Sequence, residues 1–90
     1  MSFIWDIGKE RVNIRKHGVD FITAAKAFKD PKRIIVTDSK HSKEEPRYFC
    51  IGKVGNGIIT VRFTYREEKI RIYGAGHWRN ERRYYEKENS

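Results

Sequence analysis

Cationic side chains suited to holding phosphate recur through the second half of the chain. In the segment VRFTYREEKIRIYGAGHW, Arg62, Arg66 and Arg71 alternate with apolar residues. This alternation predicts strands that send one set of side chains to a core and the other set to the opposite face. Guanidinium groups hold phosphate but do not accept protons, because their pKa stays above about 12. Chemistry on a phosphate would therefore also need a titratable group.

Groups that transfer protons near neutral pH stand on both sides of these segments. His41, Glu44 and Glu45 lie in the stretch DSKHSKEEP, which has no periodicity and indicates a loop, and His77 follows the last arginine segment. For any single histidine, a surface position without chemical duty is the plainer interpretation. His17 is expected to cap a helix end.

The spacing of apolar residues predicts the elements that position these groups. We expect strands at 3–5, 33–37, 47–54, 58–66 and 69–75, and helices at 9–16, 20–28 and 78–88. Asp6 and Asp20 stand where helix N-caps are favoured. The fold class is therefore α+β, with two N-terminal helices packed on a twisted antiparallel β-sheet and a C-terminal helix.

Two short turns predict how the last three strands pair, and hence which side chains share a face. The turns are placed at Asn56-Gly57 and Glu67-Glu68. The resulting pairs are Gly52 with Val61, Arg47 with Arg66, Phe63 with Ile72, and Arg62 with Tyr73. One face then collects Arg47, Lys53, Arg62, Arg66, Arg71 and Tyr73. Two arginines directly across a ladder cost stability, so we favour a phosphate-binding face over a merely solvated one.

The composition sets limits on the class of protein. Ninety residues predict one domain spanning 1–90, and 20 Lys+Arg against 12 Asp+Glu give a net charge of +8, which favours a polyanionic partner such as nucleic acid. No apolar run approaches about 20 residues, so no membrane span is expected. A single cysteine, Cys50, and no signal peptide indicate a reducing, cytoplasmic setting. No cluster has metal-ligand spacing, and we expect neither a metal nor a cofactor.

An ordered set of short stretches, covering nearly the whole chain, resembles the BrnT family of ribonuclease toxins from type II toxin–antitoxin systems. The stretches are FIWD (3–6), NIRKHGV (13–19) with Phe21 and Ala24, FKDP (28–31), DSKHSKEEPR (38–47), IG (51–52), IRI (70–72), ERR (81–83) and YE (85–86). The resemblance implies a RelE-like fold and RNA cleavage without a metal. It also implies a BrnA-like antitoxin, with operator DNA bound only through that antitoxin and complexes up to a heterotetramer.

One departure from the family pattern falls at the last strand. The resemblance implies the order Arg-Ile-Ile-Ser-Ala-Arg there, whereas this chain has Gly76 in place of the final arginine. Either His77 or Arg79 supplies the missing cation, or the activity is weaker than in the family at large.

The leading hypothesis is an endoribonuclease toxin that inhibits translation. Glu45 or His41 would deprotonate a ribose 2′-hydroxyl, and His77 would protonate the leaving 5′-oxygen. The remaining roles are stabilisation of the charged phosphate by Arg47, Arg66 and Arg71, and RNA binding by Lys53, Arg62, Tyr73 and Arg79.

Two alternatives use the same basic face without cleavage. In a partner-binding module, exposed Tyr84 and Tyr85 on the last helix would form part of the interface. In a nucleic-acid-binding domain of low sequence preference, Phe49 and Tyr73 would stack on bases.

Overall fold

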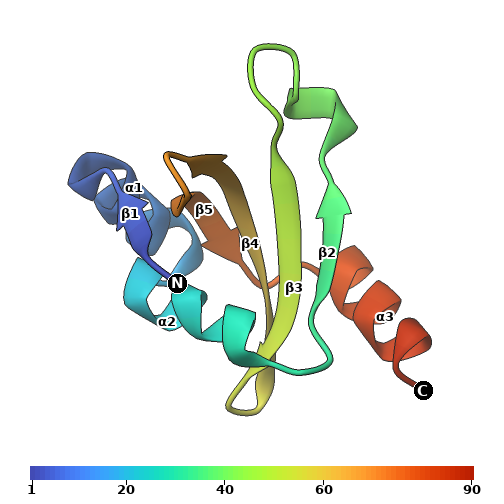
Figure 1. Cartoon of the computed structure of the whole chain (residues 1–90). Helices are drawn as coiled ribbons and strands as arrows, with labels where there is room; N and C mark the ends of the chain where they lie inside the picture. Colours follow the sequence, from blue (N-terminus) through green and yellow to red (C-terminus); the bar gives the residue numbers. More distant parts are fainter.

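In the computed structural model, which describes residues 1–90, the chain folds as an α+β protein with three α-helices and a five-stranded sheet (Figure 1). The strands are β1 (Phe3–Trp5), β2 (Ile34–Thr37), β3 (Tyr48–Val54), β4 (Gly57–Arg66) and β5 (Lys69–Gly76). The helices are α1 (Ile7–His17), α2 (Phe21–Ala25) and α3 (Arg79–Glu88), with 3₁₀ turns η1 (Lys26–Lys29) and η2 (Ser39–His41). The predicted fold class is confirmed, and every predicted element is present within a few residues of its expected bounds.

The sheet is mixed, so the prediction of an antiparallel sheet is wrong at one edge. The strand order is β1-β5-β4-β3-β2. β1 pairs parallel with β5, placing Phe3 beside Ile70 and Trp5 beside Ile72, whereas the other pairs are antiparallel. No hairpin turn dictates the direction of β1, because helices rather than a tight turn connect it to the next strand.

Caps and glycine set the limits of the first two helices. The Asp6 carboxylate accepts the N–H of Lys9 at 2.8 Å, and the Asp20 carboxylate accepts that of Thr23 at 3.1 Å, as predicted. Gly18 ends α1 in the left-handed conformation, with φ of 69°. The predicted continuous helix at 20–28 changes to a 3₁₀ turn at its second half.

α2 and η1 cover the first face of the sheet and form the main core. Their buried residues Phe21, Ala24, Ala27 and Phe28 pack against Cys50, Ile59, Val61, Phe63, Ile70, Ile72 and Ala75 of the strands. A Cβ at Gly52 would overlap the carbonyl oxygen of Ala27, so this glycine lets η1 approach β3 closely.

α1 contacts β5 without joining α2 in a common layer, so the predicted packing of two N-terminal helices on the sheet is met only in part. Its one buried residue is Asn13. The Asn13 amide donates to the carbonyls of Val19 and Ala75, both at 2.9 Å, and accepts the N–H of Ala75 at 3.1 Å. A saturated buried amide therefore fixes α1 to β5 in place of an apolar stripe.

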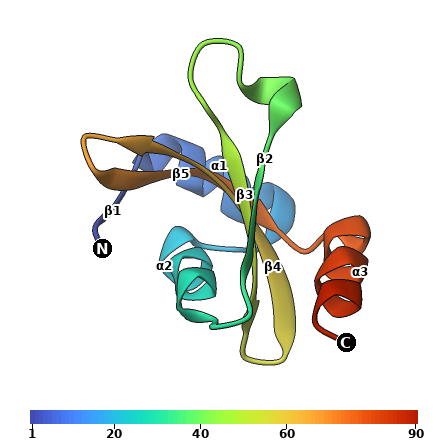
Figure 2. The same ribbon diagram turned by 45° about the vertical axis from the view of Figure 1, so that its right-hand side comes forward.

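α3 lies on the second face, opposite α2 (Figure 2). It covers the part of that face around Ile51 and Thr60, each 1% exposed. Tyr85 is only 7% exposed, and its hydroxyl donates to the Asp30 carboxylate at 2.5 Å, so the prediction of an exposed Tyr85 is wrong. Burial raises the pKa of Tyr85 to about 12, and the bond to Asp30 adds to the rise. Tyr84 is exposed, as predicted.

The rest of the second face is open, and the strand register decides what it carries. Gly52 pairs with Ile59 rather than Val61, because the turn is at Gly55-Asn56, where Gly55 has φ of 60°. A slip of two residues keeps every side chain on its predicted face, since the strand period is two.

A second difference lies between β4 and β5. Phe63 pairs with Ile72 as predicted, but a bulge beside Phe63 pairs Arg62 with Gly74 and leaves Tyr73 as the extra residue. The predicted facing pair of arginines is also absent, because the slip between β3 and β4 pairs Tyr48 with Phe63 and so moves Arg47 away from Arg66 along β4. The Thr64 hydroxyl donates to the carbonyl of Pro46, next to Arg47.

Candidate active site

The loop between β2 and β3, residues 38–47, is closed at its base by hydrogen bonds and extends beyond the sheet (Figure 1). The N–H of Asp38 donates to the carbonyl of Arg47 at 2.8 Å. The Ser42 hydroxyl donates to the Asp38 carbonyl at 2.6 Å and accepts the N–H of Arg47 at 2.9 Å. His41, Glu45 and Arg47 are thereby held on one short, ordered segment.

Within this loop, His41 is oriented by a buried carboxylate. Its Nδ1 lies 2.8 Å from Oδ2 of Asp38, whose side chain is 4% exposed, whereas the imidazole is 57% exposed. The contact occupies Nδ1 and leaves Nε2 as the nitrogen able to exchange a proton with a substrate. Sequence reasoning missed Asp38. The Asp-x-x-His spacing at 38–41 was its only signal.

Glu45 brings two arginines together at the same end of the sheet. Nη2 of Arg66 lies 3.2 Å from Oε1 of Glu45, and Nη2 of Arg47 lies 3.8 Å from Oε2. Arg71 stands across from Thr64 on the same face. The carboxylate therefore offsets the repulsion that Arg47 and Arg66 would otherwise exert on each other.

Tyr73, the extra residue of the bulge, contacts this cationic group from β5. The guanidinium carbon of Arg47 lies 4.5 Å from the Tyr73 ring centroid. Burial raises the pKa of Tyr73, although the charges of Arg47 and Arg62 oppose the rise. The Tyr73 hydroxyl therefore keeps its proton at neutral pH.

Arg62 lies in the middle of the open half of the second face, between aromatic rings. Its guanidinium carbon is 4.9 Å from the Trp78 ring centroid and 6.0 Å from that of Phe49. Nε of Arg62 and the hydroxyl of Tyr73 are both buried without a hydrogen-bond partner. Leaving such donors unsatisfied costs about 1–3 kcal/mol each, which makes this part of the face a candidate for binding water or a ligand.

The glycine that departs from the family pattern has a structural partner. A Cβ at Gly76 would lie 2.8 Å from two carbons of the Trp78 indole, closer than such atoms approach. Trp78 therefore occupies the space that a side chain at position 76 would need, and the ring in turn supports Arg62. The two residues proposed to replace the missing cation, His77 and Arg79, lie elsewhere.

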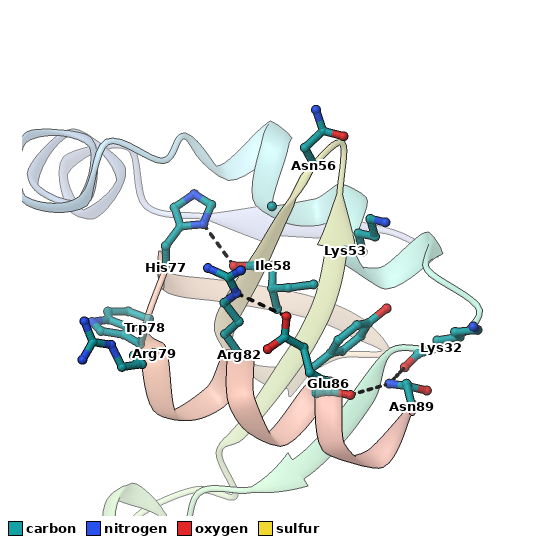
Figure 3. Close-up of a pocket in the computed structure, with 12 residues that line it drawn as sticks. Lys32, Lys53, Asn56, Ile58, His77, Trp78, Arg79, Arg82, Glu86 and Asn89 are labelled. Carbon is teal, nitrogen blue, oxygen red and sulfur yellow. Dashed lines mark hydrogen bonds and ion pairs between the residues drawn. The ribbon is translucent and has the colours of Figure 1, made fainter.

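His77, Arg79 and Lys53 line a separate cavity of about 710 Å³ between α3 and the β3–β4 hairpin (Figure 3). Lys32, Arg82 and Glu86 share its wall, and Nδ1 of His77 is 3.0 Å from the carbonyl oxygen of Ile58. Ile58 and Arg66 are at opposite ends of β4, roughly 26 Å apart at about 3.3 Å per residue. The structure therefore does not bring His77 to Glu45, His41 or Arg66.

The sequence-predicted site thus divides into two groups. Glu45, Arg47, Arg66 and Tyr73 are in contact, and His41 on the same loop, Arg71 and Arg62 belong to the same open part of the fold. Lys53, His77 and Arg79 form the distant group. The reason is topological: β3 and β5 both run antiparallel to β4, so the loop before β3 and the residues after β5 lie at opposite ends of the sheet.

Other chemistry-bearing groups are few. No three His, Cys, Asp or Glu side chains converge on a common point. Cys50 is buried in the core, and burial raises the pKa of its thiol to about 12, so it stays protonated. None of the helices has the length and apolar character that crossing a membrane requires.

Comparison with known proteins gives one family. A family model described as a ribonuclease toxin, BrnT, of type II toxin–antitoxin system matches residues 5–81 of the 90. No curated protein matches the chain. The matched residues include the whole loop 38–47 and all of β3, β4 and β5.

Proposed function

The chain belongs to the family of BrnT ribonuclease toxins of type II toxin–antitoxin systems, and we propose that it cleaves RNA without a metal at the open half of the second sheet face. The observation that carries this proposal is the convergence, at one end of the sheet, of an oriented imidazole, paired arginines and a protonated phenol. Together they provide the proton acceptor, the charge stabilisation and the proton donor that phosphodiester cleavage needs.

His41 is the residue we assign as the general base, in preference to Glu45. Asp38 fixes the ring through Nδ1, in the way a carboxylate orients a catalytic histidine, and Nε2 is free to take the proton of a ribose 2′-hydroxyl. Glu45 is already engaged by Arg47 and Arg66, which suits a positioning role.

The reaction that follows is an internal transesterification. The 2′-oxygen attacks phosphorus, the bond from phosphorus to the 5′-oxygen breaks, and a 2′,3′-cyclic phosphate and a 5′-hydroxyl result. Arg47, Arg66 and Arg71 stabilise the charge on the non-bridging oxygens, and Tyr73 gives its proton to the leaving 5′-oxygen. Tyr73 takes the role predicted for His77, because its ring contacts Arg47.

The family also implies an RNA substrate and an antitoxin protein as partners. We extend this to a BrnA-like antitoxin that neutralises the toxin, inhibition of translation in the cytoplasm, and a RelE-like fold. Arg62 holds the RNA next to the cleaved phosphate, while Lys53 and Arg79 contact its backbone further along. The net charge of +8 supports this extended contact.

Cleavage of RNA by the purified protein, with a cyclic phosphate among the products, tests this function. His41→Gln is expected to lower kcat/KM by about 10²–10⁴-fold, the usual contribution of a positioned general base. Lys43→Gln, an exposed change in the same loop, is the matched control and should keep full activity. A His41→Gln protein as active as the wild type would overturn the assignment of His41 as the base. A wild-type protein that binds RNA without cutting it would overturn the ribonuclease function and favour an RNA-binding module.

A further inference from the structure

A groove of about 390 Å³ lies between α1 and the open half of the second face. Val12, Lys16 and His17 line it from the helix, and Arg62, Tyr73 and Trp78 line it from the other side. Through Tyr73 the groove adjoins Arg47 and the loop at the cleavage site. Its volume lies in the range of sites for small organic ligands.

One wall of the groove is a fixed aromatic surface. The Trp78 ring lies against Gly76 on one side, and the His17 ring meets it edge-on with centroids 5.2 Å apart. The guanidinium carbon of Arg62 lies 4.9 Å from the centroid of the same ring. Because several neighbours fix this indole, this wall loses little conformational freedom when a ligand binds against it.

The polar groups of the groove are rich in donors. Arg62 and Tyr73 line the groove on its inner side, where Nε of Arg62 and the hydroxyl of Tyr73 lie beneath the surface without a hydrogen-bond partner, and Lys16 adds a cation. Asn13 also lines the groove, but its amide is fully used by Val19 and Ala75. A matching ligand would bring a planar ring together with hydrogen-bond acceptors and negative charge.

We propose that this groove binds one unstacked nucleobase of the RNA, with the base against Trp78 and its phosphate directed past Tyr73 toward Arg47. This inference rests on the proposed function and adds a substrate requirement: the RNA must be single-stranded where it is cut. Base stacking on an aromatic side chain is tolerant of sequence, and bases in a duplex are not available for it.

Quenching of Trp78 fluorescence by nucleoside 3′-monophosphates tests the groove directly. The measurement uses a Trp5→Phe background, so that Trp78 is the sole indole. Ribose 5-phosphate, which has no base, serves as the comparison ligand. We expect saturable quenching by the nucleotides and none by ribose 5-phosphate. Equal quenching by both, or no quenching by nucleotides at millimolar concentration, overturns the proposal.

A matched pair of substitutions on α1 tests whether nucleotides bind in this groove. Val12 and Ile14 are β-branched residues, each 44% exposed on the same helix, but only Val12 lines the groove. Val12→Phe should fill the groove and weaken nucleotide binding by about tenfold or more, while Ile14→Phe should leave it unchanged. Equal effects of the two variants refute the placement. If Val12→Phe lowers the melting temperature, nucleotide binding is measured instead on His17→Ala, an exposed change in the same groove. This variant should also bind nucleotides more weakly than the wild type.

The two proposals fail in different ways. If RNA is cleaved but Val12→Phe cleaves and binds as the wild type does, the groove is not the base site and the ribonuclease function stands. If nucleotides quench Trp78 in the wild type but not in Val12→Phe, while no RNA is cut, the base site stands and the catalytic function falls.

Discussion

Replacing Gly76 by alanine should change stability in opposite directions depending on residue 78. In the wild type the new Cβ would meet the Trp78 indole at 2.8 Å, and the ring has little room to move, because Arg62 and His17 flank it. Overpacking of this kind costs about 1–3 kcal/mol. For a chain of this size the melting temperature should fall by roughly 4–8 °C per kcal/mol.

Trp78→Ala removes the ring that causes the overlap. Gly76 is not among the residues with positive φ, so alanine fits its backbone, and in this background Gly76→Ala should stabilise the protein by about 0.4–1 kcal/mol through loss of unfolded-state entropy. Urea denaturation of the wild type, both single variants and the double variant gives the coupling energy. Additive effects, or a Gly76→Ala protein at least as stable as the wild type, would refute the contact.

Three further changes probe the fold and its dependence on pH. Tyr85→Phe removes the bond to Asp30 and should cost about 1–3 kcal/mol in urea denaturation, with no loss if Tyr85 were exposed. Burial alone would raise the pKa of Asp30, but the bonds from Tyr85 and two backbone N–H groups outweigh it and lower the pKa below 3.8. The stability that Asp30 contributes is therefore present above pH 3.8 and lost as the pH falls through its folded pKa, and a wild type whose stability does not fall there would refute it. Because the pKa of Tyr85 is raised from 10.0 to about 12, stability should also fall as the pH rises above 10.0, and Tyr85→Phe should lack that limb. Glu67→Asn with Glu68→Gly should raise the unfolding free energy by about 1–2 kcal/mol, since both glutamates have positive φ (52° and 64°); an unchanged melting temperature would contradict the strain.

The face that carries the arginines was predictable because it depends only on the alternation of side chains along each strand, not on the exact pairing of the strands. A two-residue error in the Gly55-Asn56 turn changed every partner across β3 and β4, yet left Arg62 on its predicted face. The bulge that displaces Tyr73 from its predicted partner lies directly before Gly74, and a glycine within a strand is a bulge signal that the alternation of side chains does not use. Register thus requires tertiary information that the alternation of side chains lacks.

Contacts between side chains that depend on the topology of the sheet were harder to predict from the sequence. His77 follows β5 directly in sequence, but the common direction of β3 and β5 puts it at the far end of the sheet from Glu45. Conversely, Asp38 is a short-range partner of His41 that the spacing allows, but only the fold shows that its carboxylate is buried. Adjacent Tyr84 and Tyr85 were treated alike, although successive residues of a helix point in different directions.

The departure at Gly76 looks different once Trp78 is considered with it. Taken alone, the missing arginine predicts a weaker catalyst. In the fold, the small residue makes room for an indole, and the indole supports Arg62, a cation already on the same face. We therefore infer that Arg62, a neighbour on β4, serves in place of the expected cation, rather than His77 or Arg79. Gly76→Arg should therefore lower RNA cleavage, because it would displace Trp78 and free Arg62 from its aromatic support. Faster RNA cleavage by Gly76→Arg than by the wild type would contradict this exchange.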